Sequence, residues 1–314
     1  MTKVPYIKPA LTYAAQLSQL KDRGLIIDDE QLFLEILEKK SYYRLSGYWY
    51  PFLADKENHL FKEGSSFKAA YKLYCFDREL RQLVIREIEK IEIAVRAKMI
   101  YVFSHNHGPF WYADTGNFSN INSHNDTLNK IFSEYQRSDA QFIKAFRNKY
   151  SDKFPPSWTA FEVISFGTIS RLYATINPGR SKREVAAYFG LRDKVFESWL
   201  HGLVYIRNVC AHHSRLWNRV MRIQPMKPAS PKNQWLNNTE VLNNRTYYLL
   251  SIIIYLMDSM KESHTIQSEV RALFTKYPQV HSAAMGFPND WQDEPIWQYK
   301  EGFFLRRKLE SRTI

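Results

Sequence analysis

The sequence has few cysteines and no apolar run long enough to cross a bilayer. Its two cysteines, Cys75 and Cys210, match neither a zinc ribbon nor a disulfide framework, which favours a reducing cytosol. The most hydrophobic run, YYLLSIIIYLM at 247–257, is shorter than the roughly 20 residues of a membrane span, and the first residues show no apolar signal core. We therefore expect a cytoplasmic protein, without membrane association, that buries 247–257 as a core helix.

Negative charge is also in short supply. Lys and Arg outnumber Asp and Glu by 44 to 32, which gives a net charge of +12, and such an excess favours a polyanionic partner. Nucleic acid is the first candidate. The aromatic content of 15% suits both base stacking and core packing, so it does not decide between them.

Strand patterns with hairpin turns and internal repeats are lacking, and helical periodicity dominates. Apolar residues recur at three- and four-residue steps over 66–104, which predicts one long amphipathic helix. Further helices are predicted at 12–23, 29–40, 124–149, 157–174, 181–189, 194–219 and 241–262. The fold class is therefore all-α.

Three segments interrupt this pattern. The aromatic stretch SYYRLSGYWYPF at 41–52 surrounds Gly47 and predicts a packed loop. Three prolines within 222–240 predict an excursion from the helical fold. The tail at 277–314 is irregular and rich in aromatics, and we expect it to wrap the surface. We expect a single domain over 1–314, because the apolar helix after the excursion needs a partner to cover it.

The motif RNVCAHHSRLWNR at 207–219 combines residue types that occur in catalytic sites. If 194–219 is one helix, most polar residues of the motif lie with Arg207 and Ala211 within an arc of about 140°, since each residue turns about 100°. The members of this arc are Arg207, Asn208, Ala211, His212, Arg215, Asn218 and Arg219. His213 falls on the opposite, apolar side, where a buried histidine bonded to a carbonyl is the ordinary expectation. His212 is therefore the functional candidate and His213 a structural residue.

The same helix face carries Leu200 and Val204 upstream of the motif. The polar patch would then continue into an apolar surface that another helix must cover. A second copy of the chain is one such partner.

Other kinds of site have less support. A zinc site is disfavoured because His212 and His213 diverge on a helix, Cys210 lies off the polar arc, and no carboxylate completes the set, so no metal or other cofactor is expected. A Ser-His-Asp or Cys-His triad has no local support. A solvated polar face is the general alternative for a basic helix, and the grouping of Arg, Asn and His beside apolar residues weighs against it.

The motif RNVCAHH resembles the arginine–polar–spacer–histidine signature of the HEPN superfamily, whose members include metal-independent RNases. The chain as a whole is similar to the Abi-like family of abortive-infection proteins, the AbiD/AbiF group. The stretches that carry this resemblance are KPALTYAAQLSQLKDRGLIIDD, YYRLSGYWYPF, LYCFDRELRQLVIREIEKIEIAVR, FPPSWTAFEVISFGTISRLY, RNVCAHHSRLWNR and MGFPNDW.

The resemblance implies an all-α, HEPN-like helical bundle, elaborated with additional helices, that acts in phage defence. It places Arg207, Asn208 and His212 at the family's motif positions. Arg215, Asn218 and Arg219, which share the predicted polar face with them, are expected to support RNA binding. It also implies a toxin–antitoxin arrangement in which a small non-coding RNA binds and restrains the protein. The basic segment LRRKLESR near the C-terminus fits such a partner.

An acidic residue on another helix commonly supports such sites. Glu92 lies on the polar side of the predicted long helix, although it could simply pair with Arg96 at i, i+4. Glu162 interrupts the otherwise apolar WTAFEVISF, which is an unusual placement. Both are candidates.

An RNase of this type needs a base, an acid and positive charge, because RNA supplies its 2′-OH as the nucleophile. His212 can serve as base or acid near neutral pH, Arg207 can bind the phosphate, and Asn208 can orient either. Each chain offers one such histidine, which predicts a homodimer that brings two motifs together. The alternatives are a non-catalytic RNA-binding module and a protein-interaction module in which the motif is structural.

Overall fold

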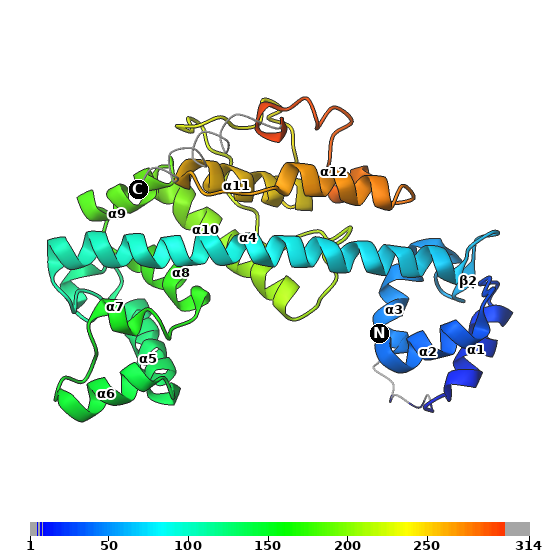
Figure 1. The fold of residues 1–314 in the computed structure, drawn as a ribbon, viewed down its shortest axis with the longest axis horizontal. Coiled ribbons are helices and arrows are strands. Elements are labelled where there is room, and N and C mark those ends of the chain that lie inside the picture. Colours follow the sequence, from blue (N-terminus) through cyan, green and yellow to red (C-terminus); the bar gives the residue numbers. More distant parts are fainter. Residues whose placement is uncertain (1–4, 6, 8, 299–314) are drawn as a thin grey trace, which may run out of the picture. The chain divides into compact units, whose positions relative to one another are not determined.

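The computed structural model describes residues 5, 7 and 9–298 of the chain, and helices dominate them (Figure 1). This confirms the predicted all-α class. One short antiparallel hairpin, of β1 (Leu53–Asp55) and β2 (Leu60–Phe61), was not predicted. The last part of the predicted tail, including LRRKLESR, lies outside the described residues.

The sequence predicts one domain, whereas the structure groups the residues into two compact units. The first unit contains residues up to Leu80 together with Leu273–Val280. The second contains Arg81–Ala272 and the residues from His281 onward. Helices α4 (Phe67–His107) and α12 (Ile266–Lys276) contribute residues to both units. The extent of α4 confirms the long helix that was predicted at 66–104.

The first unit begins with three helices, α1 (Tyr13–Asp22), α2 (Glu30–Lys40) and α3 (Tyr42–Trp49), followed by a 3₁₀ turn at Tyr50–Phe52. The first two helices confirm the predictions at 12–23 and 29–40. The prediction of a packed loop at 41–52 is wrong for residues 42–49, which form α3. Ser41 caps this helix by accepting a hydrogen bond from the Arg44 backbone nitrogen. Leu45, Tyr48 and Trp49 are buried at helical spacing. Gly47 is tolerated within the helix because this burial outweighs its low propensity.

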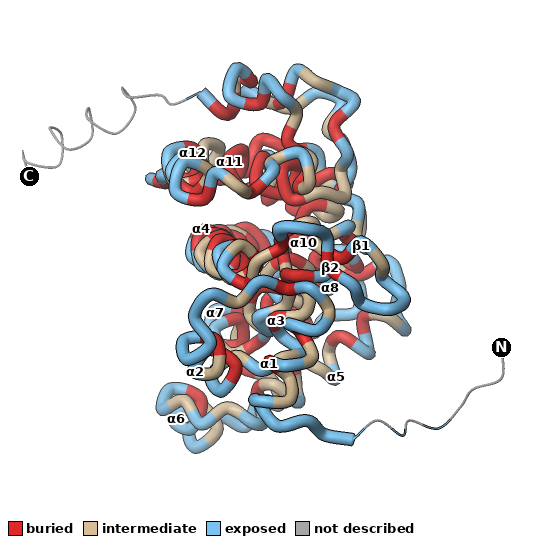
Figure 2. Tube along the Cα trace, turned by 90° about the vertical axis from the view of Figure 1, so that its right-hand side faces the viewer, coloured by how far each residue is buried: buried red, intermediate tan, exposed pale blue. Residues whose placement is uncertain are grey.

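The helices of the second unit follow α4 along the chain. They are α5 (Ile121–Arg137), α6 (Gln141–Lys149), α7 (Ser157–Ala160), α8 (Phe166–Thr175), α9 (Arg180–Tyr188), α10 (Asp193–Ala211) and α11 (Thr246–Met260). Helix α8 packs against both α5 and α10, and α11 packs against α10. The residues of α11 from Thr246 to Met257 are all buried (Figure 2), which confirms the core helix predicted at 247–257.

Two helices that were predicted as continuous are broken. The predicted helix at 124–149 is interrupted between Arg137 and Gln141, and the one at 157–174 between Ala160 and Phe166. The second break has a local cause, because Ser165 caps α8 through a hydrogen bond from the Thr168 backbone nitrogen. The break leaves 163–165 as a non-helical segment beside α5 and α8.

The proline-rich excursion at 222–240 contains no helix or strand. Hydrogen bonds join it to α10. The Met226 backbone nitrogen donates to Ser198 Oγ at 2.9 Å, and its carbonyl accepts from Trp199 Nε1 at 2.8 Å. Pro225 lies so close to α10 that a Cβ on Gly202 would come within 2.6 Å of its Cγ. The segment is thus packed on α10.

The tail was expected to wrap the surface, and within 282–297 exposed residues alternate with side chains that are buried. Trp297 is fully buried and its Nε1 donates to Ser251 Oγ of α11 at 2.9 Å. Its ring stacks on Tyr247 with 5.4 Å between centroids. The aromatic residues of the tail therefore belong to the core of the second unit.

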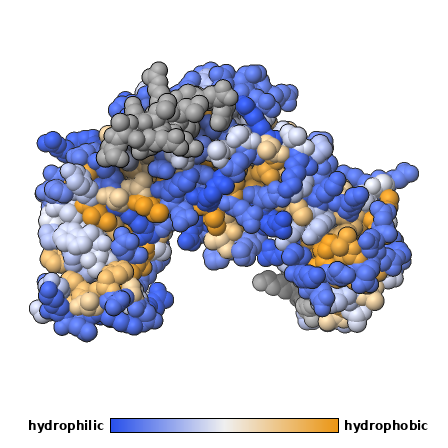
Figure 3. All heavy atoms as spheres, in the orientation of Figure 1, coloured by the Kyte–Doolittle hydropathy of each residue, from blue (hydrophilic) through white to orange (hydrophobic). Residues whose placement is uncertain are grey.

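Polar side chains cover most of the face drawn in Figure 3, among smaller apolar areas.

Candidate functional site

Helix α10 carries the start of the predicted motif and ends at Ala211 rather than at 219. His212 is the cap residue, and the chain then turns through His213, whose φ of 55° is left-handed. The turn is closed by bonds from Ser214 N to Val209 O at 2.9 Å and from His213 N to Cys210 O at 3.0 Å. This bond pattern is a Schellman motif, which satisfies the last carbonyls of the helix. The helical phasing is therefore correct through Ala211 and wrong beyond it.

The prediction that His213 is buried in the core is wrong. Its side chain is exposed, as is that of His212. The reason is that the helix ends at Ala211 and His213 has a left-handed backbone, so its side chain does not point in the direction that a continued helix would give it. The backbone of His213 thus forms the turn that ends α10.

The second half of the motif lies in a loop, so Arg219 does not share the face of Arg207. Arg219 Nε donates to the Tyr205 hydroxyl at 3.2 Å. Tyr205 precedes Arg207 by two residues and so lies about 200° from it around the helix. Asn218 accepts a 3.5 Å bond from Arg245, and the Arg215 carbonyl accepts one from Arg219 at 3.1 Å. The predicted common arc is thus wrong for these loop residues.

The apolar surface expected around Leu200 and Val204 is covered within the chain at Leu200 and partly covered at Val204. Leu200 is fully buried. Val204 faces α8, where a Cβ on Gly167 would lie 3.6 Å from Val204 Cγ1. The expectation that another helix covers this surface is therefore confirmed within the chain for Leu200, whereas Val204 stays half-buried beside α8.

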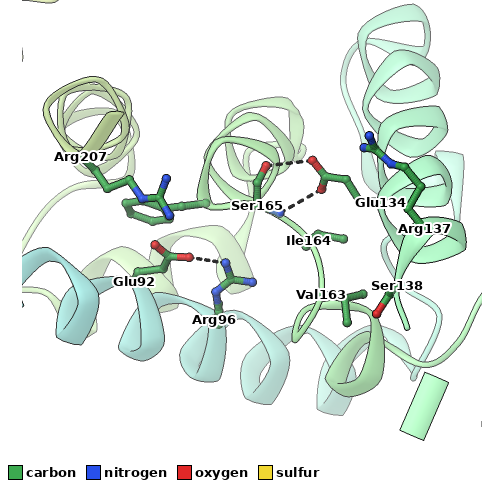
Figure 4. A pocket seen from close by; sticks show the side chains of 10 residues that line it. Glu92, Arg96, Glu134, Arg137, Ser138, Val163, Ile164, Ser165 and Arg207 are labelled. Carbon is green, nitrogen blue, oxygen red and sulfur yellow. Dashed lines mark hydrogen bonds and ion pairs between the residues drawn. The ribbon is translucent and has the colours of Figure 1, made fainter. Parts of the chain in front are cut away.

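Arg207 lines an open cleft of about 640 Å³ in the second unit. Its walls come from α4, α5, α10 and the non-helical segment 163–165 that precedes α8 (Figure 4). The charged residues of the cleft are Glu92, Arg96, Glu134, Arg137 and Arg207. Ile164 and Phe166 add buried apolar surface.

Glu92 and Arg96 form an ion pair one turn apart on α4, as their spacing suggested. The Arg96 guanidinium also donates to the carbonyl of Phe161. Figure 4 shows the Arg207 side chain extending toward Glu92, although no ion pair joins the two within the described residues. The structure thus brings one of the two acidic candidates to Arg207. The other, Glu162, is exposed and does not line the cleft.

Glu134 is a cleft residue that the sequence analysis missed. Its carboxylate accepts hydrogen bonds from the Ser165 backbone nitrogen at 2.9 Å and from the Ser165 hydroxyl at 3.0 Å. It also accepts one from the Thr168 hydroxyl at 3.2 Å. Ser165 could be identified from sequence as a helix cap, but nothing in the sequence points from it to a glutamate on another helix.

The two carboxylates of the cleft are engaged, whereas two of its three arginines have no carboxylate partner among the described residues. Arg137 Nε donates to the Ser133 carbonyl at 3.3 Å, and Arg207 Nη1 donates to Asn208 Oδ1 at 3.4 Å. Guanidinium groups with free donors bind phosphate and carboxylate oxygens in a bidentate manner. The arrangement is therefore suited to an anionic ligand.

The remaining motif residues do not line the cleft. Asn208 and His212 are exposed, and His212 stands at the C-terminal end of the helix that positions Arg207. No hydrogen bond joins Arg207 to His212 in the part of the chain that the structure describes. That same part contains no cluster of three or more His, Cys, Asp or Glu side chains arranged to hold a metal ion. None of its helices is both long and apolar enough to cross a membrane.

The profile of the Abi-like protein family matches residues 35–218, which extend from α2 to the loop after α10 and include the cleft. This chain belongs to the Abi-like family. Membership supports a role in abortive infection, a form of defence. No curated protein and no solved structure matches this Abi-like chain.

Proposed function

We propose that this Abi-like protein is a metal-independent endoribonuclease of the HEPN superfamily that acts in antiphage defence. The observation that carries the proposal is the cleft beside the motif, in which Arg207 is partly exposed and its guanidinium lacks a carboxylate partner among the described residues. His212 is exposed at the end of the same helix.

In the proposed reaction the 2′-oxygen of one nucleotide attacks the adjacent phosphorus, and its proton passes to a base. The bond from phosphorus to the 5′-oxygen breaks, and an acid protonates that oxygen. The products are a 2′,3′-cyclic phosphate and a 5′-hydroxyl. Arg207 stabilises the negative charge that develops on the phosphorane, His212 transfers a proton, and Asn208 orients one of them.

One histidine cannot be both base and acid within a single turnover unless a second group assists it. We propose that two copies of the chain bring two motifs together, so that His212 of each copy serves one role. The contact would use the exposed end of α10, since Leu200 is buried within its own chain. Sedimentation should show a dimer, and a fully active monomer would contradict this part of the proposal.

The experiment for the catalytic proposal compares wild type with Arg207→Ala and His212→Ala on total RNA. Loss of a proton-transfer group typically lowers the rate by about 10²–10⁴-fold, which we expect for His212→Ala. Loss of a group that stabilises the transition-state charge typically costs about 10²–10³-fold, which we expect for Arg207→Ala. His201→Ala is the matched control, because His201 is an exposed histidine of α10 that does not line the cleft. Cleavage should survive EDTA, leave cyclic or 3′-phosphate ends, and spare DNA.

The results also separate the competing functions. RNA binding without cleavage in the wild type would indicate a non-catalytic binding module. A protein with no salt-sensitive affinity for RNA would indicate a protein-interaction module. Strict dependence on Mg²⁺ or Zn²⁺, or 5′-phosphate products, would refute attack by the 2′-OH.

We further propose that a small structured RNA binds the protein and restrains it. The supporting observations are the net charge of +12 and the arginines of the cleft. Protein purified at low salt should carry a discrete RNA that high salt removes, because several phosphate contacts give a steep salt dependence. Protein free of RNA at low salt would instead point to a protein antitoxin.

A further inference from the structure

Arg137 is a charged residue of the cleft that the predicted motif does not contain. It lies in the last turn of α5, whereas Arg207 comes from α10, and both side chains line the same cleft (Figure 4). The segment 163–165 and the start of α8 lie between them, so the two guanidinium groups flank the cleft from different helices.

The carboxylates that could neutralise Arg137 are already engaged. Glu134, one turn earlier on α5, accepts hydrogen bonds from Ser165 and Thr168. Glu92 is paired with Arg96. Arg137 itself donates only to a backbone carbonyl, that of Ser133, among the described residues. Its charge is therefore available to a ligand, as is that of Arg207.

The size of the cleft and its two arginines without carboxylate partners, Arg137 on α5 and Arg207 on α10, favour a short piece of polyanion over a single small anion. Its three arginines and two glutamates leave one formal positive charge in excess. Its volume of about 640 Å³ lies within the roughly 300–1,000 Å³ range of small-molecule binding pockets. Val163, which lines the cleft and is only half-buried, provides apolar surface between the charged walls on which a sugar can pack, whereas Ile164 and Phe166 are buried beneath it.

We propose that the cleft binds two phosphates of one RNA strand, with the phosphate undergoing reaction on Arg207 and a neighbouring phosphate on Arg137. This inference rests on the proposed RNase function and adds a residue that positions the strand. Arg137 holds a phosphate that does not react, so it contributes equally to binding the substrate and the transition state. Its loss should weaken binding and leave the chemical step nearly unchanged.

The test measures binding of a single-stranded 2′-O-methyl RNA, which lacks the nucleophile and is not cleaved. The logarithm of the binding constant falls linearly with the logarithm of the salt concentration, and each lost phosphate contact reduces the magnitude of this slope by about 0.7 for a single strand. Arg137→Gln and Arg207→Gln should each make the slope shallower by this amount, and the double variant should make it shallower by about twice as much. Arg171→Gln is the control, because Arg171 is exposed on α8 outside the cleft and its replacement changes the net charge equally.

Two further measurements separate binding from folding and from chemistry. Arg137→Lys keeps the charge and should keep the salt slope, whereas damage to the fold would lower binding in both Arg137 variants. In cleavage assays Arg137→Gln should raise KM with kcat nearly unchanged, whereas Arg207→Gln should lower kcat.

The outcomes distinguish this inference from the proposed function. If the slope falls for Arg207→Gln while Arg137→Gln behaves like Arg171→Gln, the second phosphate site is refuted and the proposed function stands. If the wild type shows no salt-dependent RNA binding, the proposed function itself fails, and the inference fails with it.

Discussion

The carboxylate of Glu134 on α5 accepts hydrogen bonds from both the backbone nitrogen and the hydroxyl of Ser165, at 2.9 and 3.0 Å. This pair joins α5 to the first turn of α8 and fixes one wall of the cleft. Glu134→Ala should lower the free energy of unfolding by about 1–3 kcal/mol, because the charged acceptor of these donors is removed. Glu134→Gln keeps an acceptor and should cost less. Urea denaturation of the two variants is the measurement, and equal losses would show that the acceptor is unimportant.

Leu200 belongs to the core of the second unit. Leu200→Ala should lower the free energy of unfolding by about 2–5 kcal/mol, because it leaves a cavity beneath α10. Leu242→Ala, at a leucine that is 58% exposed, should change stability by less than about 0.5 kcal/mol. Thermal and urea unfolding measure both. A Leu200 variant that kept its stability and changed only the oligomeric state would restore the idea of an intermolecular surface.

His213 has a left-handed backbone, with φ of 55°. His213→Gly and His213→Ala both remove the imidazole, so their difference reports the backbone alone. The glycine variant should be more stable by about 1 kcal/mol, since alanine carries a Cβ that disfavours this conformation. The same comparison at Ala145, exposed within α6, should have the opposite sign, because glycine lowers stability in a regular helix. A lower stability for the glycine variant at 213 would argue against the turn.

A pH dependence is expected from Glu79 in the first unit. Burial tends to raise the pKa of this carboxyl, but hydrogen bonds from Lys276 and Tyr277 outweigh it and hold the pKa below the ordinary value of 4.5. A lowered pKa in the folded state stabilises the protein above the unfolded-state pKa, and this contribution is lost as the pH falls through the folded value. Glu79→Gln should therefore unfold at lower urea than wild type at pH 7. The difference should shrink as the pH falls below the ordinary carboxyl pKa of 4.5, and a constant difference would contradict the ion pair.

The long regular helices were predictable because they depend on local pattern. The apolar repeat of α4 and the continuous apolar run of α11 gave their extents within a few residues. The end of α10 was not predictable, since residues 212–224 contain no glycine or proline and a histidine takes the left-handed position instead. Helical phasing carried past that end misplaced His213 and Arg219.

For the candidate site, the sequence by itself determined the Abi-like resemblance, the basic charge, and the helix that presents Arg207 and Asn208. Only the tertiary structure decided that Arg207, Glu92 and Glu134 line one cleft. It also decided that Leu200 is buried within its own chain. The same holds for Lys182, which looks like a surface residue in sequence and is buried beside Glu197 at 3.0 Å. The physical reason is that periodicity specifies which face of a helix is apolar, whereas the choice of the helix that covers this face depends on long-range packing.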